Sequence, residues 1–329
     1  MKIALDAMGG DHAPEEIVKG AYKAAEEFDF VEKIFLVGNQ EILSGFKESK
    51  HEKIEIVHAS EVIEMDEHPA NSYRKKKDAS ITVATAMVKK GEADAVVSAG
   101  STGAQLVAAI FGLGRIKGIK RPAIGSIVPT MQGGKLLVDA GANTNVDVDN
   151  LLQFAQMGSI YMTCMMNIAE PKVGLINNGS EETKGTELTQ AAYQALKTAK
   201  GISFYGNIEG RDVPQGVCDV MVCDGFTGNV VLKTMEGMGK AIVKMLKEEL
   251  MASTRNKMGA LLAKPAFDSL KKRMDYSDYG GAPLLGVQGV SIVCHGSSDA
   301  KAVANGIKAA HIAVESGFVK KITDLMQQA

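Results

Sequence analysis

Several features that mark common classes of protein are missing from this chain of 329 residues. It has no tryptophan, and its four cysteines lack the paired spacing of a zinc site or of a secreted disulfide framework. No run approaches the roughly 18 apolar residues that cross a bilayer, and the start, MKIALDAMGGDHAP, has too short an apolar run for a signal peptide. We therefore expect a cytoplasmic protein that does not span a membrane, while attachment to a membrane surface stays open.

An excess of charge of one sign is also missing. Lys and Arg number 37 and Asp and Glu number 39, so the net charge is -2, and 45% of the residues are hydrophobic. This composition is typical of a soluble globular protein and excludes a disordered or nucleic-acid-coating one. No internal repeat or low-complexity linker divides the chain, so we predict a single domain over residues 1–329 without a nucleic-acid partner.

Motifs of several enzyme classes are absent. There is no GxxxxGK[ST], no GxSxG, no HExxH, and no GxGxxG after the first strand, which removes support from ATP hydrolysis, serine hydrolysis and ordinary NAD binding. Asp6, Asp139 and Asp224 each end a predicted strand, but a single carboxylate before glycine is a common turn residue. We expect these aspartates to orient turns by hydrogen bonding, and we expect no metal and no cofactor.

Short β-branched runs alternate with helical patterns along the chain. Strands are predicted at 2–6, 33–37, 53–58, 95–100, 172–177, 202–206, 219–223 and 290–294, and helices at 14–28, 79–90, 102–113, 147–167 and the end of the chain. Such alternation indicates βαβ units and a parallel sheet. Two apolar runs, 122–128 and 135–141, flank PTMQGG and predict a hairpin or an excursion at the edge of the sheet, so the sheet is expected to be mixed.

Seven predicted strands end in a polar, glycine-containing turn. Ligands of open α/β sheets bind at the carboxyl ends of strands, so we expect these turns to converge on one edge of the sheet. Their hydroxyls, amides and backbone N–H groups suit a phosphate or an oxyanion. The seven turns are DAMGGDHAP, SAGSTGA, DAGANTN, NNGSEETKGTELT, GNIEGRD, DGFTGN and HGSSD.

The candidate side chains in these turns are small polar groups and three cations. The cations are Lys184, His12 and His295. Lys184 precedes a predicted helix, where its charge opposes the helix dipole, so it needs an anionic partner or plain exposure. For both histidines a structural role stays open, whereas Cys294 is expected in the core. The polar candidates for phosphate are Ser101, Thr102, Asn143, Asn178, Thr227, Asn229 and Ser297.

Residues 240–275 are unlike the rest of the chain. They hold nine cations against four anions, a net charge of +5, so the remainder carries -7. Apolar residues recur here at helical spacing, with Pro265 interrupting the second pattern, which predicts a protruding pair of amphipathic helices. Such a pair can lie in a membrane interface, cover an acyl chain, dock an acidic carrier protein, form a dimer seam or pack on the core.

An ordered set of motifs now resembles a known family nearly end to end. The set is DAMGGDHAP, RKKKDAS, SAGSTGA, GRIKGIKRPAI, DAGAN, GTELT, GNIEGRD, DGFTGN, YSDYGGAPLLG and HGSSD. It closely resembles the acyl-acyl carrier protein:phosphate acyltransferase family. The resemblance implies a three-layer α/β/α, Rossmann-like fold with a mostly parallel mixed sheet, similar to phosphotransacetylases and to isocitrate and isopropylmalate dehydrogenases.

The same resemblance implies a reaction and its partners. A fatty acyl group moves from the phosphopantetheine thioester of acyl carrier protein to inorganic phosphate, giving acyl phosphate for phospholipid synthesis. A homodimer, peripheral attachment to the cytoplasmic membrane and a downstream glycerol-phosphate acyltransferase are also implied. This chain departs from the family pattern at two positions. The family motif SAGNTGA is SAGSTGA here, with Ser101, and the family motif NVGTE is NNGSE here, with Asn178. Both keep hydrogen-bonding capacity.

We predict direct attack of bound phosphate on the thioester carbonyl, since no side-chain nucleophile is evident. Lys184 and Asn229 would stabilise the phosphate and the oxyanion, and His12 or His295 would orient or protonate the leaving thiolate. Helix-start amides would hold the anion at Gly179, Gly228 and Gly296.

Two other functions are weighed beside this one. A metal- and NAD-dependent decarboxylating dehydrogenase of related fold would need clustered arginines, of which the sequence has too few. A non-catalytic membrane-surface scaffold leaves the seven turns unexplained.

Overall fold

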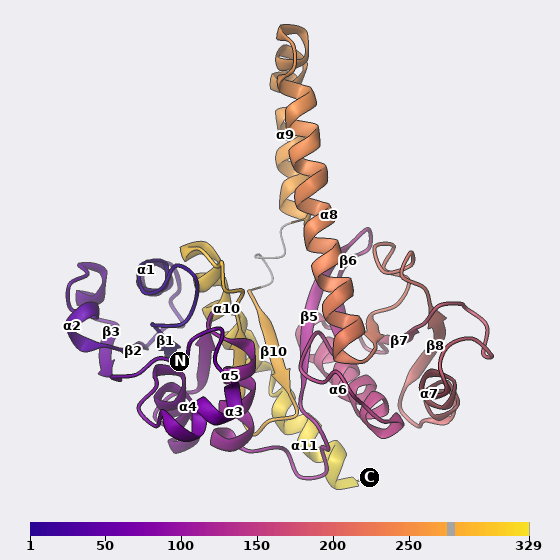
Figure 1. The fold of residues 1–329 in the computed structure, drawn as a ribbon, viewed down its shortest axis with the longest axis horizontal. Helices are drawn as coiled ribbons and strands as arrows, with labels where there is room; N and C mark the ends of the chain where they lie inside the picture. Colours follow the sequence, from indigo (N-terminus) through magenta and orange to yellow (C-terminus); the bar gives the residue numbers. More distant parts are fainter. Residues whose placement is uncertain (275–279, 329) are drawn as a thin grey trace.

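The computed structural model describes residues 1–274 and 280–328, and its strands form one eleven-stranded sheet (Figure 1). Seven neighbouring pairs are parallel and three are antiparallel, which confirms the predicted mixed, mostly parallel sheet. The order across the sheet is β3-β2-β1-β4-β11-β10-β5-β6-β9-β7-β8. The bounds are β1 Lys2–Asp6, β2 Lys33–Gly38, β3 Ile54–His58, β4 Ala95–Ser98, β5 Ala123–Thr130, β6 Gly133–Val138, β7 Lys172–Ile176, β8 Ser203–Ile208, β9 Val220–Val222, β10 Ala282–Leu285 and β11 Val290–Val293.

Helices cover both faces of the sheet because successive strand side chains point to opposite sides. Ile3 and Leu5 pack in one core with α1, α6, α7, α10 and α11, whereas Ala4 between them packs in another with α4 and α5. The bounds are α1 Glu15–Glu27, α2 Gln40–Leu43, η1 Glu48–Lys50, α3 Pro69–Lys75, α4 Ser80–Lys90, α5 Thr102–Ala108, η2 Ala109–Leu113, α6 Val148–Met166, α7 Glu187–Thr198, α8 Gly225–Met251, α9 Thr254–Met274, α10 Ala300–Ser316 and α11 Phe318–Gln328. The predicted final helix is therefore two helices, divided at Gly317, whose φ of +63° ends α10.

Strand direction reverses in the middle of the sheet. The unpredicted strand β10 runs antiparallel to both β11 and β5, and β5 forms the predicted hairpin with β6. As a result β6, β7, β8 and β9 run opposite to β1, β2, β3, β4 and β11. The expectation that seven turns converge on one sheet edge is therefore wrong, because the carboxyl ends fall into two groups that point in opposite directions.

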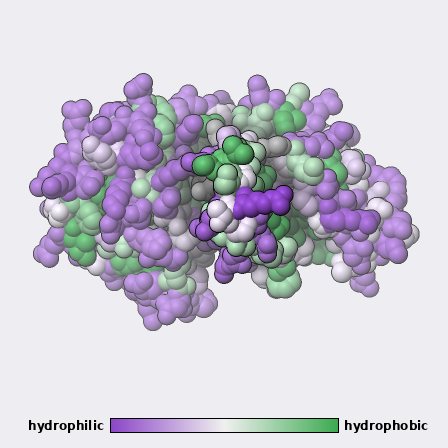
Figure 2. All heavy atoms as spheres, turned by 90° about the horizontal axis from the view of Figure 1, so that it is seen from above, coloured by the Kyte–Doolittle hydropathy of each residue, from purple (hydrophilic) through white to green (hydrophobic). Residues whose placement is uncertain are grey.

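Helices α8 and α9 form a pair that projects far from the sheet (Figure 1). The prediction that Pro265 interrupts the second helix is wrong, since α9 continues through it to Met274; a proline removes one hydrogen bond and need not end a helix. Figure 2 looks down this pair and shows hydrophobic and hydrophilic residues mixed on its projecting end. Residue 275, the predicted end of the segment, lies outside the described residues. Within residues 1–274 and 280–328, every helix is too short or too polar to span a lipid bilayer.

Candidate active site

We call the turn after the carboxyl end of a strand its exit. The exits of β1, β4 and β11 meet through glycines. A methyl group on Gly9 would lie 2.8 Å from the Cα of Gly100, and one on Gly10 would lie 3.2 Å from the carbonyl oxygen of Gly296. The Asp11 N–H donates to that same oxygen at 2.8 Å. The predicted residues that lie in these three exits are His12, Ser101, Thr102, His295, Gly296 and Ser297.

The exits of β6 and β9 meet around a buried carboxylate. Asp139 accepts hydrogen bonds from the backbone N–H groups of Ile124, Gly141, Ala142 and Asn143, and from Asn143 Nδ2, at 2.7–3.2 Å. Burial raises the pKa of Asp139, while these hydrogen bonds act to lower it. The aspartate is therefore a structural centre of the turn.

The other two aspartates singled out from the sequence also accept hydrogen bonds. Asp224 caps α8 by accepting from Thr227 N at 2.9 Å and Thr227 Oγ1 at 2.7 Å. Asp6 accepts from Ser98 Oγ at 2.7 Å. The expected hydrogen-bonding role of the three aspartates is confirmed.

The β7 exit carries Asn178, Gly179 and Lys184. The Lys184 side chain is exposed, and within the described residues no hydrogen bond or ion pair engages its ammonium. Its backbone carbonyl accepts from Asn177 Nδ2 at 3.1 Å, and α7 begins shortly afterwards behind the cap Thr186. Because β7 lies beside β9 in the sheet, Lys184 belongs to the group of exits that contains Asn229. Its open ammonium is suited to an anionic ligand.

Helix α8 joins the two groups of exits. Asn229 in its second turn lies beside Gly141 of the β6 exit, and one turn later Lys233 Nζ lies 2.9 Å from His295 Nε2 of the β11 exit. Glu236 accepts from Lys233 Nζ at 2.9 Å and lies 3.7 Å from the same histidine nitrogen. Residues four and seven apart share a helix face, so Asn229, Lys233 and Glu236 form one polar stripe. Sequence reasoning missed Lys233 and Glu236, although this spacing in NVVLKTME was a usable signal.

The predicted helix-start amides need correction. Gly228 lies inside α8, where its N–H donates to Asp224 O at 2.9 Å, so it has no amide to offer an anion. Instead, a methyl group there would overlap the carbonyl oxygen of Asp139, which shows that glycine is needed for close packing. Gly179 and Gly296 lie in loops outside the helices that follow them, so neither is a helix-start residue.

Several predicted polar groups are already occupied within the protein. Both N–H groups of the Asn143 amide are used, one by Pro122 O at 2.8 Å and one by Asp139. Thr227 Oγ1 donates to Asp224, and Ser101 Oγ caps α5 by accepting from Ala104 N at 3.4 Å. These side chains therefore shape the turns. Those left exposed for a ligand are His12, Thr102, Asn178 and Asn229. Ser297 is also exposed, and its hydroxyl lies 2.8 Å from His295 Nδ1.

Cysteine chemistry is not available at the β11 exit. Cys294 is buried, and burial raises the pKa of its thiol to about 12, so the thiol stays protonated at neutral pH. The expectation that Cys294 belongs to the core is confirmed. Within the described residues, no three His, Cys, Asp or Glu side chains are grouped to hold a metal ion.

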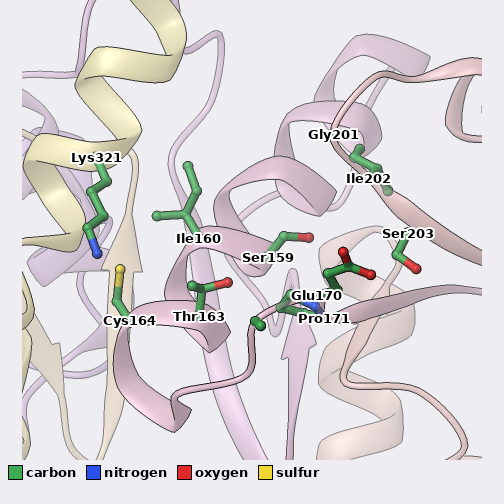
Figure 3. Close-up of a pocket in the computed structure, with 11 residues that line it drawn as sticks. Ser159, Ile160, Thr163, Cys164, Glu170, Pro171, Gly201, Ile202, Ser203 and Lys321 are labelled. Carbon is green, nitrogen blue, oxygen red and sulfur yellow. The ribbon is translucent and has the colours of Figure 1, made fainter.

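A cavity of about 420 Å³ lies away from these exits (Figure 3). It is lined by α6 residues such as Ser159, by Lys321 of α11, and by the segments that precede β7 and β8. It therefore lies at the amino ends of these strands, and none of the predicted site residues lines it.

Comparison with known proteins gives close relatives. A family model described as fatty acid synthesis protein matches residues 1–321. A phosphate acyltransferase from Desulfitobacterium hafniense is 55% identical over 325 residues, which cover 98% of this chain and 96% of that protein. One from Heliobacterium modesticaldum is 57% identical over 328 residues, with coverage of 98% and 97%.

Solved structures share the fold at low identity. The EutD phosphotransacetylase from Staphylococcus aureus aligns with a TM-score of 0.62 at 16% identity, covering 95% of this chain and 94% of that chain. A 4-hydroxythreonine-4-phosphate dehydrogenase from Klebsiella pneumoniae gives 0.52 at 11% identity, with coverage of 95% and 99%. The predicted likeness to the phosphotransacetylase fold is confirmed. The family match and the relatives that align over nearly their whole length show that this chain belongs to the fatty acid synthesis protein family, which includes the phosphate acyltransferases.

Proposed function

We propose that this protein transfers a fatty acyl group from acyl carrier protein to inorganic phosphate. A phosphate oxygen forms a bond to the thioester carbonyl carbon, the carbon–sulfur bond breaks, and its electron pair leaves on the sulfur as thiolate. The products are acyl phosphate and free acyl carrier protein. The observation that carries the proposal is the identity of 55% and 57% to phosphate acyltransferases over nearly the whole chain.

The proposed phosphate and oxyanion ligands are Lys184 and Asn229. Both side chains are exposed, and both follow neighbouring parallel strands, β7 and β9. An ammonium and an amide held at fixed positions stabilise negative charge as it develops, without reorganising water. Further contacts to phosphate are assigned to Thr102, Asn178, Gly179, Gly296 and Ser297, and His12 is assigned to the thiolate side of the reaction.

The test is formation of acyl phosphate by the purified protein from acyl carrier protein thioester and phosphate. Lys184→Ala is expected to lower turnover about 100-fold to 1000-fold, the usual cost of removing an oxyanion donor. Lys200→Ala is the control, because Lys200 is an exposed lysine in the same β7-to-β8 crossover. No phosphate-dependent product from the wild type would overturn the function, and unchanged turnover in Lys184→Ala would remove only that residue.

We propose in addition that the projecting pair α8–α9 attaches to the cytoplasmic membrane surface. Leu261 and Leu262 are 72% and 85% exposed within a segment of net charge +5. Exposed leucine beside lysine favours binding at an anionic lipid interface. Flotation with anionic vesicles should recover the wild type but not Leu261→Glu/Leu262→Glu. Ile42→Glu/Ile312→Glu, which changes exposed side chains on the body, should float as the wild type does.

The proposed assembly is a homodimer that uses the apolar face of α8. Met238, Ile242 and Met245 are exposed at helical spacing on this helix. Sedimentation equilibrium should give twice the chain mass for the wild type and the single chain mass for Ile242→Asp; a monomeric wild type would contradict the proposal.

The proposed partner that uses the product is a downstream glycerol-phosphate acyltransferase, which would receive acyl phosphate made at the membrane surface.

A further inference from the structure

The ammonium of Lys233 is held in a fixed position between the two groups of exits. Glu236 Oε2 and His295 Nε2 each lie 2.9 Å from Lys233 Nζ. The Glu236 side chain is only 11% exposed, whereas that of Lys233 is 48% exposed. An ammonium has three N–H donors, and within the described residues two are used here. The third N–H is therefore oriented by a largely buried carboxylate and is open to an incoming ligand.

The hydrogen bonds of His295 decide which of the two residues can serve a leaving group. Both ring nitrogens face donors: Nε2 faces Lys233, and Nδ1 faces Ser297 N at 3.2 Å and Ser297 Oγ at 2.8 Å. A neutral imidazole accepts at one nitrogen only. Two of these neighbours can only donate, and of the two the Lys233 ammonium is charged and lies closer, at 2.9 Å from Nε2 against 3.2 Å from Ser297 N to Nδ1, so Nε2 is the acceptor. The Ser297 hydroxyl can accept as well as donate. The proton then lies on Nδ1 and is donated to the Ser297 hydroxyl oxygen. His295 consequently has no proton at Nε2 to give to a thiolate.

We propose that Lys233 is a further catalytic residue, whose third N–H stabilises the leaving thiolate, with Glu236 and His295 as positioning residues. This inference rests on the proposed acyl transfer. Lys233 follows Asn229 by one helical turn, about 6 Å along the axis, so both reach one small substrate group. An alkyl ammonium holds its proton more tightly than an alkyl thiol does. Lys233 therefore acts through its charge, and the thiolate takes its proton from water afterwards.

The experiment compares leaving groups in the full-length protein. Lys233→Met is assayed with phosphate and two acyl thioesters, one of pantetheine and one of a more acidic aryl thiol. We expect a loss of about 100-fold to 1000-fold with the pantetheine thioester, and a loss of less than about 10-fold with the aryl thioester, whose thiolate needs less stabilisation. Retained aryl turnover also shows that the variant is folded. Lys240→Met, at an exposed lysine two turns further along α8, should match the wild type with both.

Equal losses with the two thioesters, or a rise confined to the KM for phosphate, would overturn the role of Lys233 in thiolate stabilisation.

The reverse reaction gives a second measurement, because thiolate formation on pantetheine should require a higher pH in Lys233→Met than in the wild type. Coincident pH profiles would contradict the inference. Glu236→Gln should lose about 10-fold with the pantetheine thioester only. A wild type that makes no acyl phosphate would instead refute the proposed function.

Discussion

The two groups of strand exits are built by different means. At the β6 and β9 exits, Asp139 is buried and accepts five hydrogen bonds, while Gly228 lets α8 lie directly on the Asp139 backbone. At the β1, β4 and β11 exits, close approaches of Gly9 and Gly10 join the turns, and Asp6 accepts from one serine hydroxyl and one backbone N–H. The first group is fixed by a saturated polar network, and the second by small residues.

This difference has a consequence for the site. A saturated network has no group left for a ligand, so Asp139, Asn143 and Thr227 serve to set where α8 begins. The stripe Asn229, Lys233 and Glu236 then extends from that fixed start towards His295 at the other exits. The exits of β6 and β9 therefore orient side chains of α8 that act at the more open exits of β1, β4 and β11.

The largest expected effect comes from breaking the contact between α8 and the β6 exit. In Gly228→Ala the new methyl would overlap backbone atoms of Asp139, which cannot move without disturbing five hydrogen bonds. We expect a loss of about 3 kcal/mol in the free energy of unfolding, measured by urea denaturation. The matched variant Gly237→Ala, on the same helix with open space around it, should gain roughly 0.5–1 kcal/mol. Similar stability of the two variants would contradict the account.

A second, smaller effect compares the two aspartates directly. Asp139→Asn puts an amide N–H among groups that are all donors, so a loss of about 2 kcal/mol is expected. Asp6→Asn should cost less than about 1 kcal/mol, because the Ser98 hydroxyl can turn and accept from the new amide. Burial raises the pKa of both carboxyl groups, so asparagine also removes the cost of burying a charge. Equal losses in thermal or urea unfolding would show that the exits do not differ in this way.

Local sequence patterns predicted most of the strands and the polar turns, but not how the two halves of the sheet meet. Alternating apolar runs are local, so β1, β4 and the hairpin β5–β6 could be foreseen. Strand direction depends on long-range pairing: β10, which is four residues long, pairs antiparallel with both β11 and β5, so β5 keeps the direction of β11 and the β5–β6 hairpin then reverses the later strands. A glycine near a helix start is also compatible either with a backbone amide open to a ligand or with close packing against another segment. Only the packing of the folded chain shows that Gly228 lies against the Asp139 backbone.

The smallest expected effect tests the link between the two groups of exits. Burial acts to raise the pKa of Glu236, but its contacts with the neighbouring His295 and Lys233 leave that pKa below its ordinary value. A carboxyl group whose pKa is lower in the folded state than in the unfolded state stabilises the protein at pH values above the unfolded-state pKa, which is near 4.3. This contribution is lost as the pH falls through the lower folded-state pKa. Glu236→Gln should therefore be less stable than the wild type at pH 7, by less than about 1 kcal/mol since Lys233 is half exposed.

The pH dependence separates this linkage from a general loss of packing. In urea unfolding, the difference between wild type and Glu236→Gln should shrink from pH 7 towards pH 3, because the wild-type carboxylate becomes protonated and loses its advantage. Glu248→Gln, at an exposed glutamate on the projecting part of α8, should follow the wild type at every pH. A difference that stays constant down to pH 3 would mean that Glu236 acts by its shape rather than its charge, and α8 would then join the exits without an electrostatic link.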